Sequence, residues 1–319
     1  MKKTIIKILL LIALAGFFPI SSFALTISPP TMEFIAKRGE TITDVVKLFN
    51  ETSAPITLVA EVRDFKPLNE KGTPNFLPIA DKNDPSKLSN WIDVKEKTVT
   101  LKSNERKNIL FTINIPDGAF PGGHFAGILW AMPSANKDSV GITSKTGTLI
   151  LVNIAGMAEE KARIIEFSAD KKMYNHLPVN LSLRFENMGN VYLKPIGEIK
   201  IKNIWGKEVA SLDVNPGLNN ALPGSVRQYN VSWKNKDVAE NLSEIIKEKD
   251  NFAFGRYSAV ATLGYGSADQ TLIAEKSFWV FPWRVIGISL ITILVVFLIF
   301  VLGIKRYNRW ILEKYGKKS

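Results

Sequence analysis

The residue types that perform catalysis are scarce in this sequence. Its 319 residues contain two histidines, His124 and His176, and no cysteine. A serine hydrolase triad would need a histidine together with a Gly-x-Ser-x-Gly turn, and that motif is missing. The sequence also has no close group of zinc ligands, no glycine-rich phosphate or dinucleotide loop, and only dispersed carboxylates. We therefore expect a protein that is not an enzyme and that uses no metal or cofactor.

One glycine-rich stretch is the first candidate for a binding site. Phe120-Pro-Gly-Gly-His-Phe-Ala-Gly127 runs directly into Ile128-Leu-Trp130. In one interpretation, this bend presents His124 and Trp130 to a ligand, and the indole stacks on the face of a sugar. In the other interpretation, the glycines only give the backbone the freedom that a tight bend needs, and Trp130 belongs to a core. We favour the second interpretation and keep the first as the candidate ligand site.

Three other stretches carry aromatic residues that could lie in a core or on a surface. The segment from Asp64 to Asn90 is rich in proline and charge, which predicts a long surface loop rather than sheet. Its Phe76 and Leu77, with Trp91 just beyond, could form an exposed patch, but a small core under the loop is the favoured interpretation. We expect Trp205 and Trp233 to lie in a core as well.

These candidate residues must be positioned mainly by β-strands. Ile56, Leu58, Ala60 and Val62 alternate with polar residues, and so do Ile109, Phe111, Ile113 and Ile115. Alternation predicts strands with one buried and one wet face. Later in the chain the same pattern occurs at Val179–Phe185, where Asn180, Ser182 and Arg184 occupy the wet face, and at Tyr257–Tyr265. Short strands separated by turn residues predict β-sandwiches.

One helical segment interrupts the second half of the chain. Asp237 and Glu240 have the spacing of a capping box, and Val238, Leu242, Ile245 and Ile246 share one face. We expect a short connecting helix at the edge of a sandwich.

The C-terminal part of the chain predicts a membrane anchor. The run from Val285 to Ile304 is uncharged, and its 20 residues would span about 30 Å as a helix, the hydrocarbon thickness of a bilayer. Aromatic residues flank it, as at a membrane interface. We expect a transmembrane helix over 282–304, with interface anchors at its two ends: Trp279, Trp283, Arg284, Lys305 and Arg306.

The charged flanks predict the orientation of this helix. The tail 305–319 carries six basic residues against Glu313, whereas Arg284 is the nearest base on the other side. The positive-inside rule places the tail in the cytoplasm. At the other end of the chain, residues 1–24 have the basic start, apolar run and small residues of a signal peptide cleaved after Ala24. Both features predict a single-pass type I protein of the plasma membrane.

The net charge of +11 excludes a nucleic-acid partner once it is located. The signal peptide carries three of these charges, the tail five and Arg284 one, which leaves +2 for the ectodomain. A nucleic-acid surface would need bases clustered on the folded part. Without disulfides, each domain must be large enough to be held by its core. We therefore expect two domains, residues 25–160 and 161–281.

The order of these parts resembles the WxL-interacting protein family of bacterial cell-surface proteins. The similar residues are Ile27-Ser-Pro-Pro30, Ile115-Pro116, Pro121–Ile128, Asn187–Pro195, Leu222-Pro-Gly-Ser225, Gly255-Arg-Tyr257 and Phe278–Trp283. The resemblance implies a first Ig-like domain that binds peptidoglycan, a second that binds a host or partner protein, and a membrane anchor with a basic tail.

We therefore expect an all-β protein of two tandem Ig-like β-sandwiches followed by one C-terminal transmembrane helix. The favoured function is non-catalytic binding of peptidoglycan or another envelope glycan, of a protein partner, or of both. The alternative is a membrane-tethered, chaperone-like or assembly scaffold that pairs a free strand edge with a client protein. An open edge without lysine or proline would favour this alternative, whereas a polar surface lined by aromatic residues would favour glycan binding.

Overall fold

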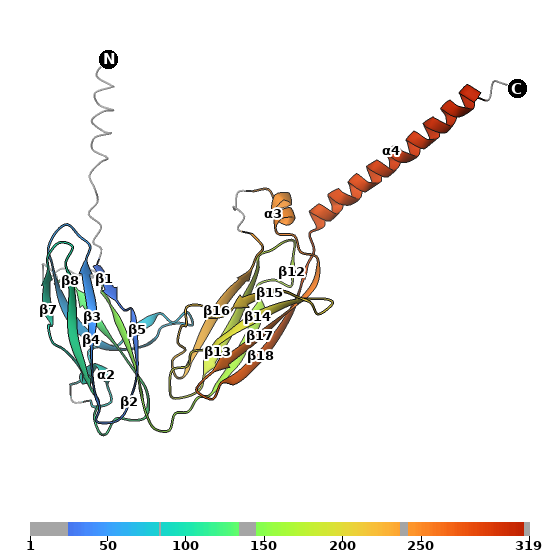
Figure 1. Cartoon of the computed structure of the whole chain (residues 1–319). Coiled ribbons are helices and arrows are strands. Elements are labelled where there is room, and N and C mark those ends of the chain that lie inside the picture. Colours follow the sequence, from blue (N-terminus) through green and yellow to red (C-terminus); the bar gives the residue numbers. More distant parts are fainter. Residues whose placement is uncertain (1–24, 83, 134–144, 237–241, 316–319) are drawn as a thin grey trace, which may run out of the picture. The chain divides into compact units, whose positions relative to one another are not determined.

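The protein consists of two β-sandwiches and one long C-terminal helix, as the sequence predicts (Figure 1). The computed structural model describes residues 25–82, 84–133, 145–236 and 242–315. The predicted signal peptide and the predicted capping box at Asp237 and Glu240 lie outside these residues. The chain divides into two compact units, Met1–Leu68 with Pro74–Glu159, and Asn69–Thr73 with Glu160–Ser319.

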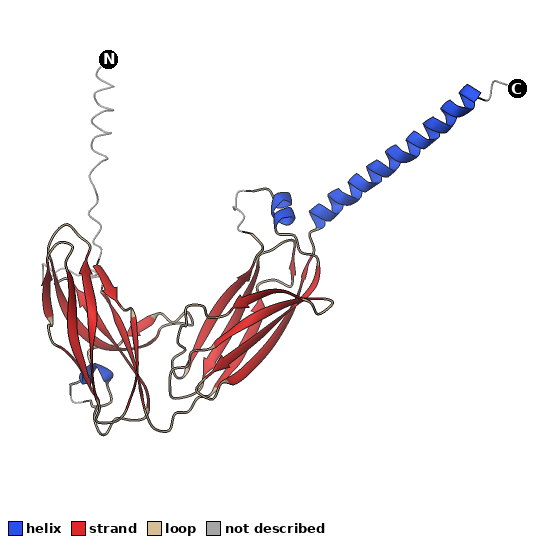
Figure 2. Ribbon diagram, viewed as in Figure 1, coloured by secondary structure: helices blue, strands red, loops and turns tan. Residues whose placement is uncertain are grey.

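The first unit is a sandwich of two sheets (Figure 2). Its elements are β1 (Leu25–Ser28), β2 (Thr31–Ala36), β3 (Thr41–Asn50), β4 (Ile56–Pro67), β5 (Pro74–Phe76), α2 (Leu88–Trp91), β6 (Ile92–Val94), β7 (Thr98–Leu101), β8 (Arg106–Asn114), β9 (Gly122–Ala131) and β10 (Thr146–Ile154). One sheet has the order β1-β3-β8-β6. The other has the order β2-β10-β9-β4-β5, with β7 also paired to β4. Among the described strands of this unit, only β2 and β10 pair in parallel.

The apolar faces of these strands enclose the first core. Phe111, Ile113 and Ile128 are among its fully buried side chains. Trp91 at the end of α2 is also part of this core, so its predicted buried position is confirmed. The prediction of a long surface loop rather than sheet over Asp64–Asn90 is wrong in part, because the chain extends β4 to Pro67 and turns back through β5 before α2.

The second unit repeats the architecture and continues into α4. Its elements are β11 (Ala162–Ala169), β12 (Met173–Tyr174), β13 (Val179–Asn187), β14 (Ile196–Asn203), β15 (Glu208–Asp213), β16 (Ser225–Trp233), α3 (Glu244–Asp250), β17 (Gly255–Tyr265), β18 (Gln270–Val280) and α4 (Trp283–Tyr315). A three-stranded sheet has the order β11-β13-β16, and a five-stranded sheet has the order β12-β18-β17-β14-β15.

Aromatic side chains fill much of the second core. Phe185 and Phe278 are fully buried, and Trp233 packs edge-on against Tyr257 with 4.9 Å between ring centroids. The predicted core position of Trp233 is therefore confirmed. The same prediction is wrong for Trp205, whose side chain is 82% exposed in the β14–β15 turn. The turn continues through Gly206, whose φ of +75° suits glycine, and it leaves Trp205 with no core to enter.

The helix α4 is long and apolar enough to cross a membrane over Trp283–Ile311. It begins at Trp283, close to the predicted start at residue 282, and continues past the predicted end at residue 304 to Tyr315. The basic residues Lys305 and Arg306 are therefore part of the helix itself.

One buried asparagine occupies the same place in each sandwich. Asn50 ends β3 and Asn187 ends β13, and each of these strands lies second in its smaller sheet. The Asn187 side chain donates to the carbonyls of Val191 and Ala221 at 2.8 Å each and accepts from the Gly189 N–H at 2.9 Å. Asn50 likewise bonds several backbone groups of its own turn and of a neighbouring segment. Each asparagine thus satisfies backbone groups that water cannot reach.

We expect Asn187→Leu to lower the free energy of unfolding of the second sandwich by about 3 kcal/mol. It leaves the Val191 carbonyl without its Asn187 bond and the Gly189 N–H without its acceptor, and the Ala221 carbonyl keeps only its bond from the Leu193 N–H. Urea unfolding of the full chain in detergent measures this loss. Asn203→Ala is the matched control, since the Asn203 side chain bonds backbone amides in an exposed turn. Equal stability of the two variants would contradict the role assigned to Asn187.

Candidate functional site

His124 and Trp130, the two residues of the predicted ligand site, do not form a binding surface together. Trp130 is 1% exposed and belongs to the first core, so it cannot stack on a ligand. His124 points to the same inner face of β9, at the rim of the sandwich, where its ring packs 4.6 Å from that of Trp91. Its Nε2 atom lies 2.9 Å from the Phe120 carbonyl. The interpretation of Trp130 as a ligand contact is therefore wrong.

The second sandwich carries a more suitable surface on its three-stranded sheet. Direct pairing across the sheet aligns Ser168 with Ser182 and Ser182 with Asn230. The next row joins Asn180 to Ser232. Because paired residues of neighbouring strands point to the same side, these polar side chains share the outer face, while Leu181 and Leu183 face the core.

These rows line a shallow groove of about 440 Å³. Its lining residues are Ser168, Asp170, Asn180, Leu181, Ser182, Gln228, Asn230, Val231 and Ser232. Gln228 donates to the Ser182 hydroxyl at 2.7 Å, and the Ser232 hydroxyl donates to the Asn180 side chain at 3.0 Å. Amide and hydroxyl groups can each donate and accept hydrogen bonds, so these side chains suit a ligand rich in amides or hydroxyls.

One carboxylate stands at the end of the groove. Asp170 accepts hydrogen bonds from the Tyr174 hydroxyl and, at 3.3 Å, from the Asn180 side chain. Partial burial opposes ionisation of Asp170, but these bonds outweigh it and hold the pKa of the carboxyl below its usual value. Burial and the neighbouring Asp170 in turn raise the pKa of Tyr174 far above its usual value. The groove therefore ends in a fixed negative charge at neutral pH.

The groove borders an open strand edge. β16 is the last strand of its sheet, and it contains neither lysine nor proline. The N–H of Gln228 donates outward, to the carbonyl of Glu70 in the Asn69–Thr73 segment of this unit, at 2.8 Å. Alternate residues share this direction, so the backbone groups of Asn230 and Ser232 also face outward. Among the described residues, no backbone hydrogen bond engages these two residues at the outer edge.

The sequence indicated the wet face of β13 but not this groove. Alternation placed Asn180, Ser182 and Arg184 opposite the core. Their convergence with residues of β11 and β16 depends on strand order and register, which no local pattern predicts. Within the described residues, no group of three or more His, Asp or Glu side chains is arranged to hold a metal ion.

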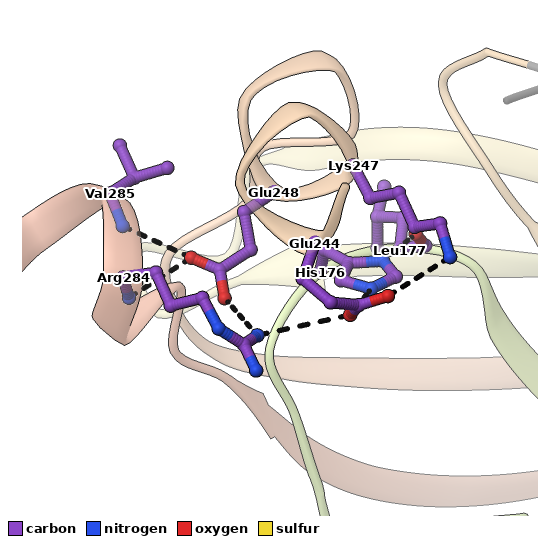
Figure 3. A network of polar contacts seen from close by, with 7 residues as sticks. All are labelled: His176, Leu177, Glu244, Lys247, Glu248, Arg284 and Val285. Carbon is purple, nitrogen blue, oxygen red and sulfur yellow. Dashed lines mark hydrogen bonds and ion pairs between the residues drawn. The ribbon is translucent and has the colours of Figure 1, made fainter. Parts of the chain in front are cut away.

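A second polar cluster joins the second sandwich to α4 (Figure 3). The carboxylate of Glu248 on α3 is fully buried. It accepts hydrogen bonds from the backbone N–H groups of Arg284 and Val285 at 3.0 and 3.1 Å and from the Arg284 guanidinium at 3.0 Å. The first N–H groups of a helix have no partner within the helix, and its N-terminus favours negative charge. Glu248 therefore caps α4 from a different element.

Exposed charges surround this buried pair. Glu244, one turn before Glu248 on α3, accepts from Lys247 at 2.9 Å and lies 3.8 Å from the Arg284 guanidinium. Its second neighbour is the His176 Nε2 atom at 3.4 Å. The hydrogen bond from Lys247 holds the pKa of the Glu244 carboxyl below its usual value. These outer contacts remain open to solvent, so we expect them to contribute little stability.

The predicted interface anchors lie at the two ends of α4. Trp279 is exposed at the end of β18, and Trp283 is exposed at the start of the helix. The Arg284 guanidinium lies 4.7 Å from the centre of the Trp283 ring, in a cation–π contact. Lys305 and Arg306 are exposed on α4, beside the stacked pair Tyr307 and Trp310. Their role at a membrane interface stays a prediction.

Comparison with known proteins identifies no family. No family model and no curated protein matches the chain. Among solved structures, the chain is similar to the class 5 fimbriae chaperone CfaA, with 13% identity over 79% of this chain and 99% of that chain and a TM-score of 0.40. It is also similar to the YadV chaperone, with 10% identity over 80% of this chain and 99% of that chain and a TM-score of 0.35. A PapD-like domain of human CEP192 covers 43% of this chain and 89% of that chain at 14% identity, with a TM-score of 0.28. Similarity at this level carries no argument about a site or a function.

We expect Glu248→Ala to lower the free energy of unfolding of the second sandwich by about 3–5 kcal/mol, because it leaves the Arg284 guanidinium and two amides without their buried partner. Urea unfolding of the full chain in detergent gives the difference. The control is Glu244→Ala, which removes an exposed contact of the same arginine and should cost less than about 1 kcal/mol. If Glu244→Ala lowered the free energy of unfolding as much as Glu248→Ala, the buried position of Glu248 would have no special role in joining α3 to α4.

Proposed function

We propose that this protein is a non-catalytic, membrane-anchored binding protein of a bacterial cell envelope. In this proposal α4 crosses the plasma membrane, its basic end lies in the cytoplasm, and both sandwiches lie outside. The length and composition of α4 support the anchor. The charge difference between its two ends supports the orientation. The order of signal peptide, two sandwiches, helix and basic tail also supports a relationship to the WxL-interacting protein family.

The partner we propose is an extended segment of another protein that adds as a strand to β16. The observation that carries this proposal is the double role of Asn230 and Ser232. Their backbone groups face the open edge, and their side chains line the groove beside it. Backbone bonds would supply affinity, and the groove would select alternate side chains of the segment. Asp170 at the groove end favours a segment with a basic residue there.

Beyond the Gln228–Glu70 bond, the edge of β16 has no lysine, proline or bulge to block strand addition. Lysine, proline and bulges blunt exposed edges. β11, at the other edge of the same sheet, has a bulge between Ile164 and Glu166, whereas the register of β13 with β16 is continuous over nine pairs. β16 is therefore the better-formed edge of this sheet for a partner strand.

A proline at the edge tests strand addition. The N–H of Ser232 faces away from β13, so Ser232→Pro keeps the ladder and removes one donor from the open edge. Peptides selected from a displayed library on the full chain in detergent should bind this variant at least about tenfold more weakly, through the lost hydrogen bond and the clash of the ring.

Two controls accompany this measurement. Asn230→Ala removes only a side chain of the groove and should weaken binding by about fivefold. Ser211→Ala changes an exposed hydroxyl on β15 and should leave binding unchanged. Unchanged binding of the selected peptides to Ser232→Pro would exclude strand addition at β16.

Phe120 favours a second candidate function, binding of peptidoglycan by the first sandwich. Its ring is 71% exposed in the turn before β9, and its carbonyl contacts His124. An exposed ring can stack on a sugar, as the buried Trp130 cannot. In a pelleting assay with protein-free peptidoglycan, we expect the full chain in detergent to sediment and Phe120→Ala to reduce the bound fraction several-fold. Sedimentation that Phe120→Ala leaves unchanged would remove this candidate site.

A further inference from the structure

The exposed aromatic side chains of the second sandwich gather at one of its ends. Up to the first residue of α4, the described part of this unit has six exposed tryptophan and phenylalanine side chains, which are Trp205, Phe252, Phe254, Trp279, Phe281 and Trp283. Only the last three are neighbours of α4 in the sequence. Trp205 lies in the β14–β15 turn, and the other two lie between α3 and β17.

Strand register places all six at the end where the chain enters α4. β17 begins at Gly255, opposite Val280, the last residue of β18 before the helix. β14 ends at Asn203, opposite Tyr257, only two residues along β17 from Gly255. The turn with Trp205 therefore lies at the same end of the sheet as Trp279 and Phe281. Across the sheet, β14 is two strands from β18, a separation of about 10 Å.

The loop after α3 reaches the same place. The Phe254 ring lies 5.8 Å from the Phe281 ring. Asn251 at the end of α3 binds the N–H of Leu177 and the backbone of Asn235 and Lys236, which ties this loop to the end of the sandwich. On α3 itself, Glu248 faces the start of α4, while Ile245 and Ile246 are exposed (Figures 1 and 3).

Charge at this end has the sign that suits lipid phosphates. Lys171 and Lys172 precede β12 and are exposed, and Arg256 is exposed opposite Trp279. The backbone N–H of Trp279 also donates to the Lys172 carbonyl at 3.0 Å, so these basic residues lie beside the aromatic residues. Aromatic and basic side chains together are typical of protein surfaces in the headgroup region of a bilayer.

We propose that this aromatic end of the second sandwich rests in the headgroup layer of the membrane that α4 crosses. The surface is continuous with the helix: Trp283 begins α4, and the Phe281–Phe254 contact joins it to the loop after α3. An apolar cluster of this size is costly to expose to water, whereas in the interface the rings bury apolar area and keep their polar edges hydrated. This inference rests on the proposed membrane anchor and adds a second contact with the bilayer.

Single cysteine labels test the proposal cleanly because the chain has no cysteine of its own. Ile204→Cys in the β14–β15 turn and Ile246→Cys on α3 carry an environment-sensitive fluorophore at the aromatic end. The full chain is reconstituted in vesicles of phosphatidylethanolamine and phosphatidylglycerol with headgroup-region spin-labelled lipid. Both labels should lose about half of their fluorescence relative to vesicles without spin label, since interfacial groups lie within about 5–10 Å of the quencher layer.

Ile196→Cys is the matched control. Ile196 is as exposed as Ile204 (59% against 62%), but it pairs with Gly264 at the opposite end of the sheet. That end lies about 30 Å along β17 from Gly255, so its label should not be quenched. In a second variant, Trp205→Ser with Phe254→Ser, the label at Ile204→Cys should lose most of its quenching. The Ile246→Cys label should stay quenched, because Glu248 holds α3 against the start of α4.

A label at Leu294→Cys, in the middle of α4, separates this inference from the anchor on which it rests. We expect lipid spin-labelled in the acyl chain to quench this label. If it does while the Ile204→Cys label is as bright as the Ile196→Cys label, the docking of the sandwich is overturned and the anchor stays intact. Absence of quenching at Leu294→Cys would overturn the anchor itself.

Discussion

The buried carboxylate of Glu248 is the interaction on which the join between the second sandwich and α4 depends. Removing a carboxylate from water is costly, and one ion pair alone seldom offsets that cost. Glu248 offsets it with three hydrogen bonds, two of them to N–H groups of the first turn of α4. Because these two N–H groups would bond carbonyls of their own helix if it began a turn earlier, the same contact favours a helix that starts at Trp283. The chain therefore passes from strand to helix at one defined place.

Both sandwiches meet the demands of a fold without disulfides in the same way. Their cores are apolar and aromatic, and each leaves backbone groups in a buried turn that water cannot satisfy. Asn50 and Asn187 supply the missing hydrogen bonds at matching positions of the two smaller sheets. A buried amide that is fully bonded defines one local structure, since a shifted turn would lose several bonds at once. This shared feature supports the tandem architecture.

Alternation predicted the strands well because it reports the inside and outside of a sheet, as at Val179–Phe185. It failed where residue type and local geometry disagree. Tryptophan is usually buried, but Trp205 follows β14 into an exposed turn and has no core to enter. A carboxylate is usually exposed, but Glu248 is buried because its partner Arg284 lies on another element. The groove was not predictable either, since Ser168, Ser182 and Asn230 come together only through the register of three strands.

The groove and the aromatic end of the second sandwich constrain each other. Asn180 on β13, which pairs with Ser232, lies three residues beyond Leu177 in the chain. The Leu177 N–H binds Asn251 next to the aromatic end. Three residues of strand cover about 10 Å. If the aromatic end rests on the bilayer, a ligand in the groove must therefore approach within about 10–15 Å of the headgroups. A segment of a protein that is itself near the membrane can do this easily, whereas a rigid glycan layer farther out cannot. If both proposals hold, the position of the groove favours a protein partner for the second sandwich.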